Sequence, residues 1–195
     1  MGSMLHSRGL FDPQEGCVTY YGAKHLAESF RTVRKNTLAI AEEIPENKYG
    51  FRATPEVMSI GEMLAHLAVS PMWQIDVHTH KIPHLDFAMF AAGLQKSQGE
   101  QQALQTKVQI IGALKENGEQ FASFLEGLDE ATLASTISFP PPVQPETKTR
   151  FEMLLGPKEH EMHHRAQLML LQRMIGQVPH LTRRRQEMQA QAANR

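Results

Sequence analysis

The sequence has a single cysteine, no long apolar segment and no excess of either charge. One cysteine, Cys17, excludes an internal disulfide and favours a reducing compartment such as the cytoplasm. No apolar run approaches the roughly 20 residues that a membrane-spanning helix needs, and no signal-peptide pattern is present. A formal charge of -1 gives no general attraction to nucleic acid or to an anionic membrane. We therefore expect a cytoplasmic protein that binds neither.

Strand patterns are also scarce, and helical periodicity fills four long segments instead. The first ends at Pro45, and its apolar residues lie three or four apart on one helix face: Leu26, Phe30, Val33, Ile40 and Ile44. The second opens on a capping box formed by Ser59 and Glu62, in which each side chain accepts a hydrogen bond from the other's backbone N–H. Pro71 removes a helix hydrogen bond and predicts an end or a kink there.

The third segment is expected from about Gln101 to Leu125, with Gly127 as the residue after its C-cap. The fourth opens at a capping box from Thr149 to Glu152 and ends before Gly176, with a kink expected at Gly156-Pro157. Irregular connections are expected at 78–90 and 128–148. The pattern predicts an all-α, up-and-down four-helix bundle with long crossover connections. Its parts are an N-terminal extension (1–19), the bundle domain (20–180) and a polar C-terminal tail (181–195).

The fourth segment carries a histidine-rich run, His160-Glu161-Met162-His163-His164-Arg165. His160 and His164 are four apart, so a helix places both imidazoles on one face, where they can reach one metal ion. Both fall on the row of residues that should face the core, whereas His163 lies about 100° away around the helix. Burying two unpaired imidazoles costs several kcal/mol, so the pair is either hydrogen-bonded or bound to a metal.

A third ligand is available in the second segment, where His66 lies in one row with Ser70 and Trp73. A bundle could bring His66 against His160 and His164. Three neutral imidazoles suit zinc or nickel, with positions left open for water or substrate. Trp73 is expected either in the core or in the wall of the pocket. The remaining histidines are weaker candidates, including a group at His78, His80 and His84.

The run from His160 to His164 also satisfies the HExxH pattern of zinc peptidases. In that mechanism Glu161 is the catalytic general base that deprotonates metal-bound water. Metallopeptidases of this type use an edge strand beside the helix, and the sequence offers no convincing strand. A peptidase is therefore kept as a minor alternative.

Four runs of the sequence resemble the DinB/YfiT-like family of metal-dependent four-helix-bundle proteins. They are 34–45, 59–68, 160–168 and 174–179, within a resemblance that spans roughly 20–180. The sequence departs from the family pattern at Ala166, where glycine is common, and at Gly156-Pro157.

The resemblance implies a zinc or nickel site at His66, His160 and His164, and a homodimer. Relatives include transferases that use low-molecular-weight thiols and a thiol-dependent isomerase. The expected function is therefore a metal-dependent transferase or hydrolase of a small-molecule substrate, with a thiol cosubstrate. Trp73, His163, Arg165 and Gln167 are expected around the metal or the substrate. The alternative is a non-catalytic, metal-binding stress-response module.

Overall fold

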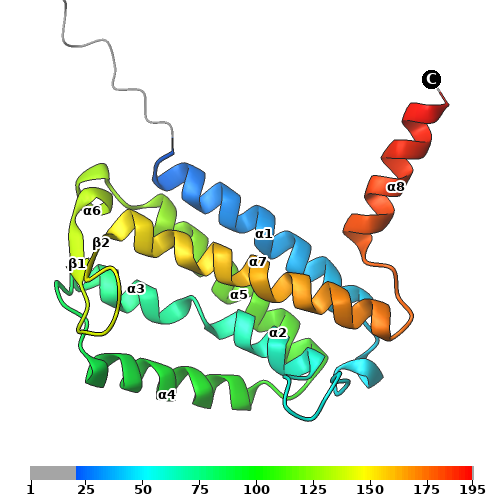
Figure 1. The fold of residues 1–195 in the computed structure, drawn as a ribbon, viewed down its shortest axis with the longest axis horizontal. Coiled ribbons are helices and arrows are strands. Elements are labelled where there is room, and N and C mark those ends of the chain that lie inside the picture. The colour runs from blue at the N-terminus through cyan, green and yellow to red at the C-terminus, as the bar shows by residue number, and fades with distance from the viewer. Residues whose placement is uncertain (1–20, 195) are drawn as a thin grey trace, which may run out of the picture.

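The computed structural model describes residues 21–194, and this part of the chain is mostly helical (Figure 1). The predicted N-terminal extension and Cys17 lie outside the described residues. In chain order the elements are α1 (Ala23–Glu43), the 3-10 turn η1 (Glu46–Lys48), α2 (Ile60–Val69), α3 (Met72–Thr79), α4 (Phe87–Ala103), α5 (Lys107–Glu126), α6 (Glu130–Ala134), β1 (Thr136–Ser138), β2 (Thr147–Thr149), α7 (Arg150–Met174) and α8 (His180–Ala193).

Four of these helices form the packed centre. Helices α1 and α2 each contact both α5 and α7, which closes a ring of helix pairs. Helix α4 packs on α2 at the edge of the molecule, while α8 projects away from the body (Figure 1). The predicted all-α class is confirmed. The predicted series of only four helices is not, because α3, α4, α6 and α8 are additional to the four central ones.

The first helix ends, and the second begins and ends, where the sequence signals predict. Helix α1 stops at Glu43, two residues before Pro45. At the start of α2, the Ser59 hydroxyl accepts a hydrogen bond from the Glu62 N–H, and the Glu62 carboxylate accepts one from the Ser59 N–H. Helix α2 ends at Val69, and α3 begins just after Pro71. The proline therefore ends one helix and starts another, in agreement with the prediction.

The predicted third helix is wrong at its start. Residues 87–103 form a separate helix, α4, whose N-cap Asp86 accepts a hydrogen bond from the Met89 N–H at 2.8 Å. Helix α5 begins only at Lys107, behind a capping box between Thr106 and Gln109. At its other end Gly127 is the C-cap, with a right-handed φ of -81°, rather than a left-handed residue beyond the cap.

Helix α7 runs without a break through Pro157, and the kink expected at Gly156-Pro157 stays a prediction. The connection before it contains the short helix α6 and a two-stranded antiparallel hairpin in which Thr136 pairs with Thr149. Helix α8 occupies most of the predicted polar tail and has no buried residue among those described. None of the described helices has the length and apolar character to cross a bilayer.

Arg150, a buried residue at the start of α7, contacts α3, the loop that follows α3 and the residue that precedes β1. The Arg150 guanidinium donates to the Ile82 carbonyl at 2.7 Å and to the Ser135 hydroxyl at 3.1 Å, and it lies 3.0 Å from Nδ1 of His78. Burial, with the Arg150 charge, lowers the pKa of His78 to about 4, so its ring is neutral at pH 7. The structure thus gives His78 a packing role at this end of the molecule.

Candidate metal centre

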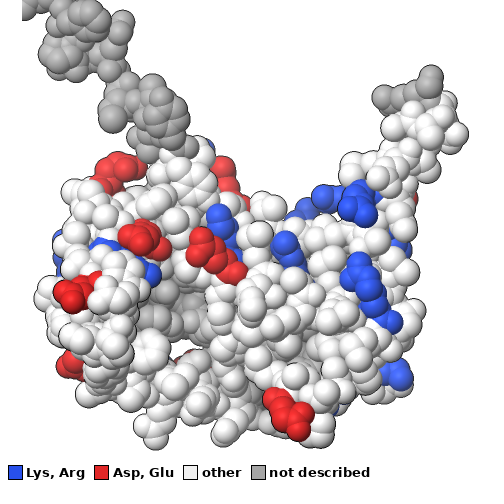
Figure 2. Space-filling view, in the orientation of Figure 1, with Lys and Arg blue, Asp and Glu red and all other residues white. Residues whose placement is uncertain are grey.

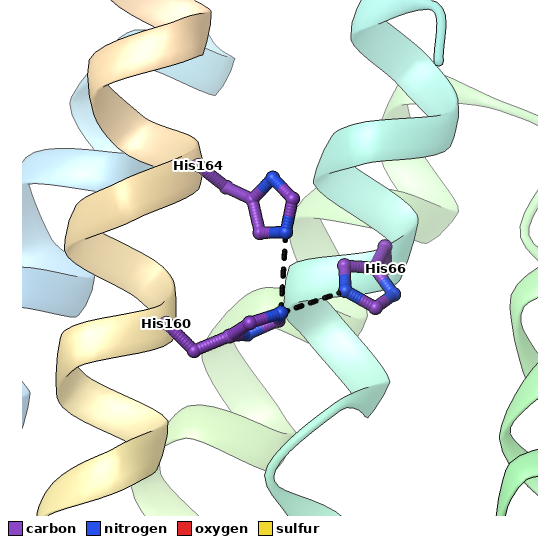
Figure 3. A group of neighbouring side chains, drawn as sticks. All are labelled: His66, His160 and His164. Carbon is purple, nitrogen blue, oxygen red and sulfur yellow. Dashed lines mark hydrogen bonds between the residues drawn. The ribbon is translucent and has the colours of Figure 1, made fainter. Parts of the chain in front are cut away.

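Three histidines from two helices converge on one point. His66 extends from α2, and His160 and His164 extend from α7 (Figure 3). Nε2 of His160 lies 3.0 Å from Nε2 of His66 and 3.1 Å from Nε2 of His164. One ring nitrogen from each of the three lies within 4.8 Å of the other two. The structure brings together the three residues that the helical spacing singles out.

The arrangement of the three nitrogens can be satisfied by one metal ion but not by hydrogen bonds among the rings alone. Two nitrogens held about 2.0–2.1 Å from a tetrahedral zinc ion are about 3.3 Å apart. A neutral imidazole nitrogen carries either one proton or one lone pair. Nε2 of His160 therefore cannot make a full hydrogen bond to both neighbours at once. A shared cation would satisfy all three lone pairs, so the donor set fits a divalent ion such as zinc or nickel.

The surroundings keep these rings neutral. Burial lowers the pKa of His66 and of His164. Burial, reinforced by the neighbouring imidazoles, lowers the pKa of His160 to about 4. A group whose charged form loses hydration gives up its proton more readily. All three rings therefore offer lone pairs to a cation at neutral pH.

Uncharged side chains hold the outer nitrogens of the rings. The amide of Gln101, in α4, lies 2.7 Å from Nδ1 of His66, and Oε1 of Gln167 lies 2.8 Å from Nδ1 of His164. The Ser70 hydroxyl lies 3.5 Å from Nδ1 of His160. Oε1 of Gln167 accepts from Nδ1 of His164 and so leaves its Nε2 for the metal, as in most ligand histidines. The Gln101 atom at Nδ1 of His66 is instead the amide nitrogen, and the amide must turn to present its oxygen before Nε2 of His66 can bind a metal. Because no carboxylate takes part, a bound ion would keep its full positive charge.

The other predicted residues differ in their relation to the three histidines. Gln167, predicted near the metal, holds His164 directly. His163 is exposed, its Nε2 lies 3.2 Å from Nε2 of Gln167, and its ring packs edge to face on His164 with ring centres 5.1 Å apart, so it borders the group without pointing its nitrogens at the other three. Arg165 lies toward α8 instead, where burial lowers the pKa of His180 and the charge of Arg165 adds a small contribution in the same direction. Gln101 was not predicted, because its segment was assigned to the start of the third helix.

Glu161 is turned about 100° around α7 from His160 and faces a buried arginine instead of the histidines. Its side chain is 1% exposed, and Oε2 accepts a hydrogen bond from Nε of Arg34 at 3.0 Å and lies 2.9 Å from Nη2 in the same ion pair. The same guanidinium donates to the carbonyls of Leu67 and Leu114. A general base must reach the proton that it removes, directly or through one water. The geometry therefore gives the HExxH mechanism no support at Glu161.

A cavity of about 290 Å³ opens beside the histidines. His66 and His160 form part of its wall, and Trp73 lies in the wall as one of the two sequence readings predicts. The remaining wall is mainly apolar or small: Phe90, Gly93, Leu94, Gly156 and Pro157. Figure 2 shows this face of the molecule hollowed between α7 and α4, with mostly uncharged atoms around the hollow. Lysine and arginine side chains gather instead over the second half of α7 and the start of α8 (Figure 2).

Comparison with known proteins agrees with this fold. No curated protein matches the sequence. Among solved structures, a DinB-like protein, YjoA, from Bacillus subtilis has a TM-score of 0.59 and 23% sequence identity, and the match covers 78% of this chain and 93% of that one. That similarity concerns the fold. The family model of the DinB superfamily matches residues 29–168, which is more than half of the chain and includes all three histidines. The chain therefore belongs to the DinB superfamily.

Proposed function

We propose that this chain is a metal-dependent enzyme that transfers a thiol to, or hydrolyses, a small molecule. His66, His160 and His164 would hold one zinc or nickel ion. The observation that carries the proposal is the convergence of three Nε2 atoms beside an open cavity, with distances of 3.0 and 3.1 Å from His160 to its two neighbours. A divalent ion there lowers the pKa of a bound thiol or water and so supplies a nucleophile at neutral pH.

The side chains of this protein would orient the metal ligands and exclude water, and would not transfer protons. Gln101 and Gln167 fix the ring planes of His66 and His164, and the cavity wall shields one side of the site from water. Among the described residues, the wall contains no carboxylate that could take a proton. A thiol ionises near pH 8.5 without help, whereas water needs a far larger shift of its pKa. The site therefore suits a thiol nucleophile better than water, and thiol transfer is the favoured reaction.

Metal content tests the ligand set. We expect about one ion per chain in the purified protein, as three histidine ligands require. His66→Ala should lose most of that metal, measured by inductively coupled plasma mass spectrometry. His163→Ala is the control, because His163 is an exposed histidine of α7 outside the triad, and this variant should keep its metal. Full occupancy in His66→Ala would contradict the proposed ligands.

Activity is tested separately by a screen of low-molecular-weight thiols against small electrophiles. We expect turnover with metal-loaded protein and none after chelation. A protein that binds metal and turns over no pair in the screen would favour the non-catalytic alternative. The homodimer implied by the resemblance stays a prediction, which light scattering coupled to size-exclusion chromatography checks.

A further inference from the structure

One face of α4 is apolar and is not covered by the rest of the described protein. Phe90, Gly93, Leu94 and Ser97 follow one another at helical spacing along the cavity wall, and Gln101 continues the row to His66. Phe90 is 55% exposed and Leu94 is 53% exposed. No described residue of α4 is buried. Helix α4 therefore forms an apolar wall of the cavity, and Gln101 near its C-terminal end contacts the candidate ligand His66.

The opposite walls complete a space with the shape and size for an aromatic group. Trp73 packs edge to face against Phe90, with ring centres 5.9 Å apart. Gly93 and Gly156 leave recesses, because no atom lies within 4 Å of the position that a Cβ would take at either. The volume of about 290 Å³ is roughly twice that of an apolar protein cavity known to hold benzene. A substituted ring fits, with room for a short chain toward the histidines.

The cavity has no partner for a charged group apart from the histidine site. Its polar wall residues besides the histidines are Ser70, Gln74 and Ser97, all uncharged. An adjoining hollow that shares Trp73 and Gly156 adds two acidic residues, Glu152 and Glu159, and one basic residue. Burying an unpaired carboxylate or phosphate is costly. The walls therefore favour a neutral, apolar group.

We propose that this cavity binds the substrate through an uncharged aromatic or branched aliphatic group, which packs against the wall formed by Trp73, Phe90 and Leu94. The polar end of the substrate lies at the histidines. This inference rests on the proposed function and adds the chemical class of its substrate. It also assigns specificity to α4, a helix that supplies no metal ligand.

Two metal-binding probes of different apolar content test the proposal. Benzohydroxamate and acetohydroxamate bind a metal through the same group, and only the first carries a ring. With zinc-loaded protein we expect benzohydroxamate to bind about tenfold or more tightly in calorimetry, because the ring is removed from water. Gly93→Leu fills the cavity and should remove this preference. Gly99→Leu is the matched control, since Gly99 is an exposed residue of the same helix that does not line the cavity, and it should retain the preference.

A second measurement does not depend on the metal. Trp73 is the only tryptophan of the chain, so its fluorescence reports on the cavity wall. Nitrobenzene, an uncharged aromatic quencher, should quench the metal-free protein with saturation, as it should Gly99→Leu, whereas Gly93→Leu should show only weak linear quenching. Equal affinity for the two hydroxamates, or linear quenching in the unsubstituted protein, would overturn the apolar cavity. Failure to bind zinc would overturn the proposed function but not the apolar cavity. The quenching of the metal-free protein by nitrobenzene would then decide whether the cavity binds an aromatic group.

Discussion

Replacing Glu161 by glutamine should lower the free energy of unfolding, and this loss should not depend on bound metal. Glu161 is 1% exposed and Arg34 is 5% exposed at the side chain, and two guanidinium nitrogens contact the carboxylate at 3.0 and 2.9 Å. Glu161→Gln leaves a buried guanidinium without its counter-charge, which typically costs about 3–5 kcal/mol. Arg34 retains two backbone carbonyl acceptors, so the lower end, about 3 kcal/mol, is expected.

Urea unfolding followed by circular dichroism measures this loss, with a chelator present so that metal binding does not contribute. A matched control is Glu42→Gln, which breaks an exposed ion pair to Lys115 of 2.8 Å. Surface pairs contribute about 0–1 kcal/mol, so this variant should unfold almost as the unsubstituted protein does. The double variant Arg34→Met with Glu161→Gln should cost less than the sum of the single changes, because neither charge is then left unpaired.

The result also separates a structural role for Glu161 from the catalytic role suggested by the HExxH pattern. A general base replaced by glutamine loses activity while the free energy of unfolding stays unchanged. A loss below about 1 kcal/mol in Glu161→Gln would refute the buried ion pair as the dominant role of this carboxylate, since it would equal that of a surface pair.

Three further predictions concern other parts of the molecule. Gln167→Leu should weaken zinc binding about 10–100-fold in a chelator competition, because the ring of its histidine partner is no longer oriented. The pKa of His78 is lowered to about 4 in the folded protein, so the unfolded chain binds a proton first as the pH falls. The free energy of unfolding should therefore fall between pH 6.5 and pH 4. At about 1.4 kcal/mol per pKa unit, the fall measured by urea unfolding should be about 3 kcal/mol smaller in His78→Gln than in the unsubstituted protein. Gly118→Ala places a Cβ 2.9 Å from Cγ of Arg34 and should lower Tm by a few degrees. Gly112→Ala meets no atom within 4 Å and should raise Tm instead; an equal shift of the same sign in both would contradict the close packing.

The sequence predicted the histidine cluster better than it predicted the helices around it. Spacing alone put His160 and His164 on one face, and the row through His66 indicated the partner helix. Helix α4 was missed because its apolar residues do not form a buried stripe: Phe90 and Leu94 are more than half exposed. The start of α5 could have been found, since Thr106 and Gln109 obey the same capping rule that located α2.

The role of Glu161 could not be obtained from the HExxH letters. Each residue turns the helix by about 100°, so Glu161 points away from His160 by more than a quarter turn. Which partner it meets depends on how α1 packs on α7, and that is a tertiary contact. One signal was present in α1, where Arg34 lies four residues after the buried Phe30 and therefore faces the interior. A buried guanidinium needs acceptors for its N–H groups, and Glu161 is the buried carboxylate that meets Arg34.

The break between α2 and α3 has a consequence for this ion pair. In an unbroken helix the N–H of residue 71 would bond to the carbonyl of Leu67, and proline has no N–H to give. Nη2 of Arg34 donates to that same carbonyl at 2.9 Å. The carbonyl of Leu67 thus receives from the Arg34 side chain the hydrogen bond that Pro71 cannot donate. The two residues are complementary although they lie far apart in sequence. A residue with an N–H at position 71 would compete with the guanidinium for its acceptor, and would extend α2 into the segment that carries Trp73. Pro71 therefore affects both the segment that carries Trp73 in the cavity wall and the hydrogen bonds of the buried Arg34–Glu161 ion pair.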